Sequence, residues 1–344
     1  MPRSRPLSWF RKLIRRLVLL AVLAALAAGA WLWRDYQRFA ERPLRLGDRE
    51  LVLEVKLGSS FTQIVGRLRQ QGLTRAPRWY WRALAHQMGV LDGLRAGEYA
   101  IVQGMNPRDL LGRMAKGLVI QHQFTIVEGW RFAELRAALA KDPILEHHSD
   151  ALSNAEIMER LGHIELNPEG RFLPETYAFV RGQDDLAILR RSFLAMQKLL
   201  DQSWRERTQP SPLAKPEQLL ILASIVEKET GRAADRERIA GVFWRRLQKG
   251  MRLQTDPSVI YGLGSAYQGN LTRLHLITDT PYNTYTRVGL PPTPIALPGR
   301  EALRATAQPA KGDELYFVAR GDGSSEFSAT LEAHNAAVRK YQLR

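Results

Sequence analysis

The sequence has no cysteine among its 344 residues, which excludes a disulfide framework and thiolate chemistry. This absence does not choose between compartments, because an exported protein can also lack thiols. The seven histidines show no HExxH or other metal-ligand spacing, and the chain has neither a GK[ST] phosphate loop nor a GxSxG elbow. We therefore expect no metal and no cofactor.

Acidic residues are in the minority, since 50 Lys and Arg against 35 Asp and Glu give a net charge of +15. A basic chain first suggests nucleic acid or an anionic surface. Residues 1–45, however, hold ten Lys and Arg against two acidic residues, and the remaining excess is spread thinly without a nucleic-acid motif. We expect no nucleic-acid partner, whereas an anionic polymer or lipid headgroups would suit the charge.

Long apolar runs are absent except for residues 17–33, which carry no charge. At 1.5 Å per residue this run spans about 26 Å, close to a hydrocarbon core of roughly 30 Å. Trp31 and Trp33 stand where an interfacial aromatic belt is expected, and six basic residues with no acid precede the run. The positive-inside rule predicts a cytoplasmic N-terminus and places everything after Arg34 outside, in a periplasm if the cell has one.

A cleaved signal peptide is the competing interpretation of this segment. Ala28-Gly29-Ala30 fits a small-residue cleavage site. The apolar run exceeds a typical signal-peptide core, however, and continues through Trp31-Leu32-Trp33. We therefore favour an uncleaved single-pass anchor in a bacterial inner membrane.

The remaining pattern predicts an α+β protein with two soluble parts. A basic tail (1–16), the transmembrane helix (17–33) and a polar stalk (34–48) precede a small unit at 49–120 and a mainly helical mixed domain at 121–344. In the small unit we expect strands at 51–55 and 98–102 and helices at 61–72, 78–88 and 107–117. In the larger domain we expect strands at 119–127 and 315–319, helices near 131–140, 153–161, 185–206, 216–230, 233–249, 300–306 and 328–341, and irregular structure over 250–299.

The helix expected at 216–230 carries the candidate catalytic residue. Pro216 opens it, Gly231 closes it, and its middle is apolar all round, so we expect it to be buried. Glu227 shares a face with Ala223 and Ser224, and desolvation there would raise its pKa toward that of a general acid. Glu229 lies about 200° around the helix, so geometry alone does not choose between the two carboxyls. Glu229 has a second interpretation, an ion pair with Arg232 or Arg236 that holds the helix end.

The irregular region after Gly250 is rich in amides, hydroxyls and aromatic rings. This mixture suits sugars, whose apolar faces lie on aromatic rings and whose hydroxyls bond amides. Ordinary turn chemistry explains the Gly and Pro, but explains the clustered Tyr, Asn, Gln and Thr less well.

Several unusual segments follow one another in this part of the chain. They are Ala223-Ser224-Ile225-Val226-Glu227-Lys228-Glu229, Arg252-Leu253-Gln254-Thr255-Asp256-Pro257-Ser258-Val259-Ile260-Tyr261-Gly262, Tyr282-Asn283-Thr284-Tyr285 and Gly289-Leu290-Pro291-Pro292, with Glu169-Gly170, Pro174-Glu175-Thr176-Tyr177, Phe327 and His334-Asn335 around them. In these segments, and from about residue 50 to the C-terminus, the chain resembles the endolytic murein transglycosylases, the MltG or YceG-like family. Glu175, Thr293 and Leu297 depart from the family pattern, in which Asp, Gly and Asn are usual at these positions. These departures concern the shape of two loops and not the identity of the catalytic acid.

The resemblance implies a lyase that cleaves the MurNAc-β-1,4-GlcNAc bond inside peptidoglycan strands and leaves 1,6-anhydroMurNAc ends, terminating nascent strands. It makes the 49–120 unit a LysM-like glycan-binding domain and 121–344 the catalytic transglycosylase domain. It identifies Glu227 as the catalytic acid and then base. The substrate-binding residues that we infer with it are Gln254, Thr255, Asp256, Tyr282, Asn283, Thr284, Tyr285, Glu175 and Tyr177. A peptidoglycan synthase is the hypothetical protein partner.

Two other functions stay open at this point. If Asp256 acted as a second carboxylate, a muramidase-type hydrolase would follow. Asp before Pro is also a common turn feature, so a structural role is as good an explanation of that residue. A non-catalytic glycan-binding scaffold of the cell-wall synthesis machinery is the third hypothesis, against which the context of Glu227 argues.

Overall fold

The computed structural model describes residues 7–46 and 51–342, which fall into two compact units, Met1–Gln121 and His122–Arg344. Part of the predicted basic tail, residues 1–6, lies outside the described residues. Residues 47–50, where the predicted stalk meets the predicted small unit, also lie outside them.

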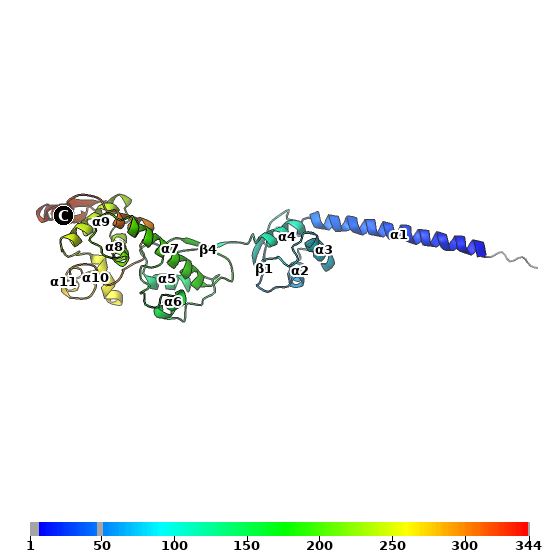
Figure 1. The fold of residues 1–344 in the computed structure, drawn as a ribbon, viewed down its shortest axis with the longest axis horizontal. Coiled ribbons are helices and arrows are strands. Elements are labelled where there is room, and N and C mark those ends of the chain that lie inside the picture. Colours follow the sequence, from blue (N-terminus) through cyan, green and yellow to red (C-terminus); the bar gives the residue numbers. More distant parts are fainter. Residues whose placement is uncertain (1–6, 47–50, 343–344) are drawn as a thin grey trace, which may run out of the picture. The chain divides into compact units, whose positions relative to one another are not determined.

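The predicted membrane segment belongs to one long helix, α1 (Leu7–Glu41), shown in blue in Figure 1. This helix is apolar and long enough to cross a membrane, and none of its most apolar stretch is buried inside the protein. Its 35 residues correspond to about 52 Å, so it extends beyond the apolar run at both ends. The prediction of an N-terminal transmembrane helix is thus consistent with the fold, whereas its helical limits were too narrow.

The stalk predicted over 34–48 is not a free linker in its described part. Helix α1 continues to Glu41, and Tyr36, Ala40 and Leu44 are buried in the core of the first unit. The Tyr36 hydroxyl donates a 2.7 Å hydrogen bond to the Gln87 side chain. The sequence stretch looks polar because only one side of the helix packs, and that side carries the aromatic and small residues.

The small unit follows the predicted order of elements closely. Strand β1 pairs with β2 in an antiparallel ladder in which Leu51 faces Ile101 and Val55 faces Gly97. The bounds are β1 (Leu51–Val55), α2 (Phe61–Gln70), α3 (Arg78–Gln87), β2 (Gly97–Ile101) and α4 (Pro107–Lys116). Local signals fix the ends of α4, where Asn106 caps the first turn and Gly117 adopts a left-handed conformation. Trp81 and Leu84 of α3 are fully buried against residues of α1, α2 and α4.

The second unit is mainly helical, as predicted, with short antiparallel strand pairs. Two four-residue strands, β4 and β6, were not predicted; they pair with β3 and β5. The region expected to be irregular contains α10, α11 and a short 3-10 helix, Gly264–Ala266. The bounds are β3 (His122–Thr125), α5 (Phe132–Leu139), α6 (Asn154–Leu161), β4 (Thr176–Phe179), α7 (Asp185–Arg205), α8 (Pro216–Glu229), α9 (Ala233–Gln248), α10 (Asp256–Leu263), α11 (Arg273–Ile277), α12 (Arg300–Ala307), β5 (Tyr316–Ala319), β6 (Ser325–Ser328) and α13 (Leu331–Tyr341).

Helix α8 forms the centre of the second unit. Every residue from Leu219 to Val226 is buried, as the all-round apolar sequence predicts. Helices α7, α9 and α12 pack around it, and Figure 1 shows α8 beside α9 and α7. The last turn, Glu227–Glu229, lies at the edge of this core, so the two candidate carboxyls are held on a rigid element.

Candidate active site

Glu227 lies where the last turn of α8 meets the start of α12. Its Oε2 accepts a 2.8 Å hydrogen bond from the backbone N–H of Gly299. Burial raises the pKa of the Glu227 carboxyl and the nearby Glu128 raises it further, whereas the Gly299 N–H, Arg236 and Lys228 lower it. A pKa raised above its ordinary value is the change that a glutamate needs to serve as a general acid.

The segment that carries Gly299 is fastened to α8 by a residue one turn before the acid. The hydroxyl of Ser224 is buried and accepts a 3.0 Å hydrogen bond from the N–H of Ile295. The same hydroxyl donates to the Ile221 carbonyl, so both its roles are satisfied inside the core. Ser224 shares a helix face with Glu227, as predicted, and its hydrogen bond to Ile295 therefore holds the 295–299 segment over the acid.

A second carboxyl at this place, Glu128, was not identified from the sequence. It adjoins Gly299 so closely that a Cβ on that glycine would overlap its carboxylate. The loop that carries Glu128 is tied down by two backbone bonds to Leu297, one through Gly129 and one through Trp130. From the sequence, Glu128 is only the residue that follows a predicted strand. No local pattern predicts its contact with residues about 170 positions later in the chain.

Glu229 faces a different cluster on the other side of the helix end. The Thr255 hydroxyl donates a hydrogen bond to Glu229 Oε1. Burial raises the pKa of Glu229 to about 7, and the Asp256 charge adds to this, whereas the Thr255 bond and Arg246 oppose it. Among the described residues Glu229 forms no ion pair with Arg232 or Arg236, so the interpretation that it closes the helix end in this way is wrong.

The raised pKa of Glu229 predicts a pH-dependent stability. An unfolded glutamate titrates near 4.5, and the folded one near 7, so between these values the folded state binds more protons and stability falls as pH rises. We expect Glu229→Gln to remove this loss, so the Tm of the variant gains on wild type between about pH 5 and pH 8. Thermal unfolding followed by fluorescence over that range measures the difference. The exposed Glu159→Gln is the control, and a difference for Glu229→Gln that stayed constant with pH would contradict the assignment.

Asp256 belongs with Glu229 and not with Glu227. Its Oδ1 accepts a 2.6 Å hydrogen bond from the Tyr285 hydroxyl, and it begins α10 beside Pro257. Its charge acts on Glu229, while Glu128 is the acidic residue that acts on Glu227. A second carboxylate for a hydrolytic mechanism would therefore have to be Glu128.

The predicted sugar-binding loops come together, but several of their polar groups are used inside the loops. The Asn283 amide donates to three backbone carbonyls, those of His275, Leu276 and Thr278. Thr284 Oγ1 accepts from the N–H of Thr255, and Gln254, at φ +51°, is exposed. Of these residues, we expect Gln254 to contact a sugar directly, while the buried Asn283 and Thr284 hold the loop in shape.

The 281–292 loop borders a hollow of about 270 Å³, lined by Pro281, Arg287, Val288 and Leu290 together with Asn283 and Thr284. Tyr282 stands in an adjoining hydroxyl network. Its hydroxyl lies 2.9 Å from that of Thr293, and its ring packs 4.9 Å from that of Tyr261. Thr293, one of the departures from the family pattern, therefore supplies a hydroxyl where glycine would supply none.

A buried carboxyl, Glu169, connects this network to the rest of the unit. It accepts a 2.9 Å bond from the Phe132 N–H and a 3.1 Å bond from the Tyr261 hydroxyl. Burial raises its pKa, and those hydrogen bonds oppose the rise. All its oxygens are engaged by protein groups, so we assign Glu169 a positioning role.

The two remaining predicted binding residues differ in what they contact. Glu175 is exposed and accepts a 2.6 Å bond from Arg300, the first residue of α12 and the neighbour of Gly299. Tyr177 is buried and donates to the Leu173 carbonyl at 2.8 Å. The geometry therefore gives Glu175 access to a ligand and leaves the Tyr177 hydroxyl engaged within the fold.

One group with metal-ligand chemistry forms away from these carboxyls. Atoms of His147, Asp150 and Asp185 lie within 4.8 Å of one another. The Asp185 carboxylate, however, already accepts bonds from the N–H groups of His148 and Ser149 and from the Ser149 hydroxyl. These hydrogen bonds close the loop that precedes α6. This structural role is sufficient to explain why the three side chains lie close together.

With this geometry in place, comparison with known proteins defines the class. The chain belongs to the YceG-like family, whose model matches residues 53–340. It is 28% identical over 309 residues to the endolytic murein transglycosylase of Bacillus subtilis (strain 168), covering 84% of each chain. It is 27% identical over 356 residues to the protein of that name from Streptococcus pneumoniae serotype 2 (strain D39), covering 94% of this chain and 64% of the relative.

A solved structure agrees with this assignment. The crystal structure of a yceG-like protein from Listeria monocytogenes matches with a TM-score of 0.52 at 29% sequence identity, covering 84% of this chain and 99% of that one. The resemblance to the endolytic murein transglycosylases that the sequence indicates is therefore confirmed, as is the α+β class.

Proposed function

We propose that this chain is a membrane-anchored endolytic transglycosylase of peptidoglycan, with Glu227 as its catalytic acid and base. The observation that carries the proposal is the half-buried Glu227 carboxyl, with its raised pKa, at the end of a fully buried helix. The relatives named endolytic murein transglycosylase support the reaction class. The substrate is the MurNAc-β-1,4-GlcNAc bond within a glycan strand.

The proposed reaction uses one carboxyl twice. Protonated Glu227 gives its proton to the glycosidic oxygen as the bond from C1 of MurNAc to that oxygen breaks. The Glu227 carboxylate then takes the proton from the C6 hydroxyl of the same MurNAc as O6 attacks C1 and closes the 1,6-anhydro ring. The Gly299 N–H bond stabilises the carboxylate between the two steps.

Glu128 is the residue whose replacement distinguishes this reaction from hydrolysis, the second candidate function. Hydrolysis needs a second carboxylate, and the position of Glu128 beside Gly299 is the observation that favours it. In the transglycosylase, Glu128 only raises the pKa of Glu227 through its charge. We expect Glu128→Gln to retain cleavage and to shift the alkaline limb of the pH profile of kcat/KM to lower pH, because the charge that raises the pKa of Glu227 is removed. The measurement is the pH dependence of glycan cleavage, with the exposed Glu159→Gln as control.

The outcome that would favour a hydrolase is also clear. A hydrolase that held its water with Glu128 would lose about a hundredfold or more in kcat at every pH in the glutamine variant. The predicted pH shift without such a loss would leave Glu128 as an electrostatic neighbour of the acid.

The direct test of the function is a digest of purified glycan strands with the full-length protein. We expect internal cuts, seen as a fall in strand length, and fragment ends whose mass corresponds to 1,6-anhydroMurNAc. Ends that have gained a water would establish the hydrolase. Strands that are bound but remain uncut would establish the scaffold.

The proposed topology is a single pass through the inner membrane with a cytoplasmic N-terminus and a periplasmic catalytic unit. The exposed apolar surface of α1 and the basic residues that precede its apolar run support this orientation. A reporter fused to the C-terminus and active only in the cytoplasm would overturn it. In this location the enzyme would terminate nascent strands beside a peptidoglycan synthase, and loss of co-purification under mild crosslinking would count against that partner.

A further inference from the structure

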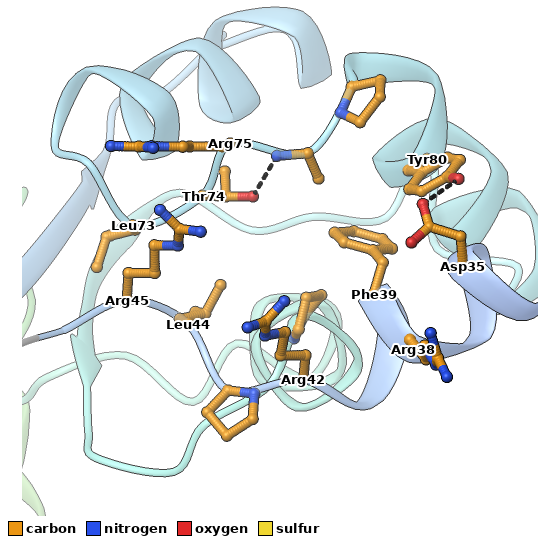
Figure 2. Close-up of a pocket in the computed structure, with 14 residues that line it drawn as sticks. Asp35, Arg38, Phe39, Arg42, Leu44, Arg45, Leu73, Thr74, Arg75 and Tyr80 are labelled. Atoms are coloured by element: carbon orange, nitrogen blue, oxygen red, sulfur yellow. Dashed lines mark hydrogen bonds between the residues drawn. The ribbon is translucent and has the colours of Figure 1, made fainter.

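Helix α3 runs across α1 just beyond the apolar run. The Tyr80 hydroxyl donates a 2.7 Å hydrogen bond to Asp35, which Figure 2 shows at the edge of the hollow between α1 and the 73–77 loop. The Tyr36 hydroxyl donates a 2.7 Å bond to the Gln87 side chain. The two contacts are about 10 Å apart along α3, whereas their partners are neighbours on α1. They therefore hold α3 across α1 instead of along it.

These contacts also fix the level of α3 along α1. Asp35 is two residues past Trp33, the last aromatic residue of the apolar run. Phe39 is six residues past Trp33, and its ring lies 5.4 Å from that of Tyr80. At 1.5 Å per residue, the contacts place the axis of α3 about 3–9 Å beyond Trp33. A helix with its side chains has a radius of about 5–6 Å, and the lipid headgroup layer is roughly 5–8 Å thick. If Trp33 marks the edge of the hydrocarbon core, the side of α3 nearer to the apolar run reaches the headgroup layer.

The rest of the small unit joins α1 farther from the apolar run. Arg108 of α4 forms a 3.1 Å ion pair with Glu41, the last residue of α1. The N–H of Leu44 bonds the carbonyl of Met105, which lies between β2 and α4. Of the elements that these contacts attach to α1, α3 is therefore the nearest to the apolar run, and Figure 1 shows it on the side of the small unit from which α1 extends.

The exposed side of α3 is the side opposite the core. Four residues of α3 are buried in the core of the first unit: Tyr80, Trp81, Leu84 and Ala85. The exposed residues recur at the spacing of one helix face, which we call the α3 face: Arg78, Trp79, Arg82, Ala83 and His86. Because the core lies farther along α1 than α3 does, the α3 face is turned back toward the apolar run.

The α3 face carries positive charge. No acidic residue occurs in α3, and in the described part of the chain the guanidinium groups of Arg78 and Arg82 form no hydrogen bond or ion pair. Arginine at a membrane surface attracts anionic lipids and can bond their phosphates through its fork of N–H groups. The fold leaves both guanidinium groups available for such contacts.

Aromatic rings connect the α3 face to the apolar run. Trp79 is 51% exposed, and its ring lies 4.2 Å from that of Tyr80. The Tyr80 ring lies 5.6 Å from that of Tyr36, which in turn lies 5.9 Å from that of Trp33. Tryptophan and tyrosine gather at the level of lipid headgroups, because one end of the side chain is apolar and the other is polar. The series from Trp33 to Trp79 has the composition of an interfacial belt that continues from α1 onto α3.

We propose that the α3 face lies in the headgroup layer of an anionic bilayer, in the leaflet next to the small unit. The inference rests on the proposed membrane anchoring of α1. Since α1 continues into the core of the small unit without a break, this contact would hold the unit at one height and in one orientation on the membrane surface.

The absence of native cysteine allows one label at each chosen position. Full-length variants with a single introduced cysteine carry a nitroxide and are reconstituted in phosphatidylcholine vesicles with a minor fraction of phosphatidylglycerol. Electron paramagnetic resonance measures collisions of each label with dissolved oxygen, which concentrates in lipid, and with a water-soluble nickel chelate. The positions are Ala83 on the α3 face, Leu23 in the apolar run and Leu57, which is 94% exposed on the loop after β1.

We expect the Ala83→Cys label to be shielded from nickel relative to the Leu57→Cys label, and the Leu23→Cys label to be shielded most. In the Ala83→Cys background, Arg78→Gln/Arg82→Gln is expected to weaken the contact of the α3 face with the vesicle about 30-fold, seen as a gain in nickel access. The matched control is Arg113→Gln/Lys116→Gln, which removes two charges from exposed positions of α4 and should leave the label shielded.

Three results would overturn the proposal. An Ala83→Cys label as open to nickel as the Leu57→Cys label would place the α3 face in water. An equal gain in nickel access in the two double variants would mean diffuse attraction of the whole unit. Dipolar broadening of the Ala83→Cys spectrum would mean that a second copy of the chain covers the face.

Failure of the membrane anchor would be seen separately. A Leu23→Cys label that is open to nickel lacks a surrounding bilayer, and the proposed topology then fails first. A Leu23→Cys label in lipid together with an Ala83→Cys label in water would remove only the contact of the α3 face. Glycan cleavage by each labelled variant, measured in detergent, is expected to equal that of wild type, which verifies the fold.

Discussion

Replacing Glu227 by glutamine is expected to lower the kcat of glycan cleavage by at least about a thousandfold. The side chain is the same size and its amide oxygen can still accept the Gly299 N–H, so the local structure is retained. The variant loses both proton transfers, because an amide neither protonates the glycosidic oxygen nor takes the C6 hydroxyl proton. Product formation from purified strands, followed by mass, measures the loss.

Two comparisons make this result specific to Glu227. Glu229→Gln changes the neighbouring carboxyl, whose raised pKa would also suit an acid, and is expected to retain cleavage within about tenfold of wild type. Binding of the strands by Glu227→Gln should be unchanged, since the residue acts in the chemical step. Full activity in Glu227→Gln together with inactivity in Glu229→Gln would assign the catalytic role to Glu229 instead.

Gly170→Ala is expected to destabilise the second unit by about 2–4 kcal/mol and to impair cleavage together with stability. Gly170 has φ +79°, and a Cβ there would lie 2.5 Å from Cβ of Pro294 and 3.3 Å from the Ala296 carbonyl oxygen. Both neighbours belong to the segment that leads to Gly299, so relief of the clash displaces the donor that holds the acid. The unfolding midpoint should fall by about 5–15 °C.

A second glycine provides the control for backbone strain alone. Gly162 has φ +88°, and no atom lies within 4 Å of the place that a Cβ would take, so Gly162→Ala adds the backbone cost without the clash. We expect it to cost about 1 kcal/mol and to leave the kcat of the folded enzyme unchanged. Equal stability losses in the two variants would contradict the packing of Gly170 against Pro294.

The helices could be predicted because their signals are local. Pro216 and the apolar run after it define α8, and Pro107 with Gly117 defines α4 within a residue. Burial of the middle of α8 followed from its all-round apolar composition. The short strands β4 and β6 were missed, since four residues carry too little periodicity to be distinguished from a loop.

The surroundings of the acid could not be predicted for a different reason. Glu227 is 72 residues from Gly299, and Lys228 is 99 residues from the Gly129 carbonyl that it contacts. Periodicity places Glu227 on a face of its own helix, but it does not say which distant loop covers that face. Glu128 therefore emerges only from the fold.

The joint between α1 and the small unit shows the same limit in another form. Charged residues at 34–48 predicted a stalk because the sequence window averages over both sides of the helix. In the fold, one side of α1 carries Tyr36, Phe39 and Ala40 against the core of the first unit, while Arg38 on the same helix is exposed. A mixed composition of this kind is found in a helix that packs on one side as readily as in a linker.

The central claim is that the C6 hydroxyl of the substrate, and not water, is the nucleophile that Glu227 serves. The most direct measurement is a digest of glycan strands by the full-length protein in oxygen-18 water, with the new ends analysed by mass. We predict 1,6-anhydro ends that contain no oxygen-18. Reducing ends that carry one oxygen-18 atom would contradict the claim and identify water as the nucleophile.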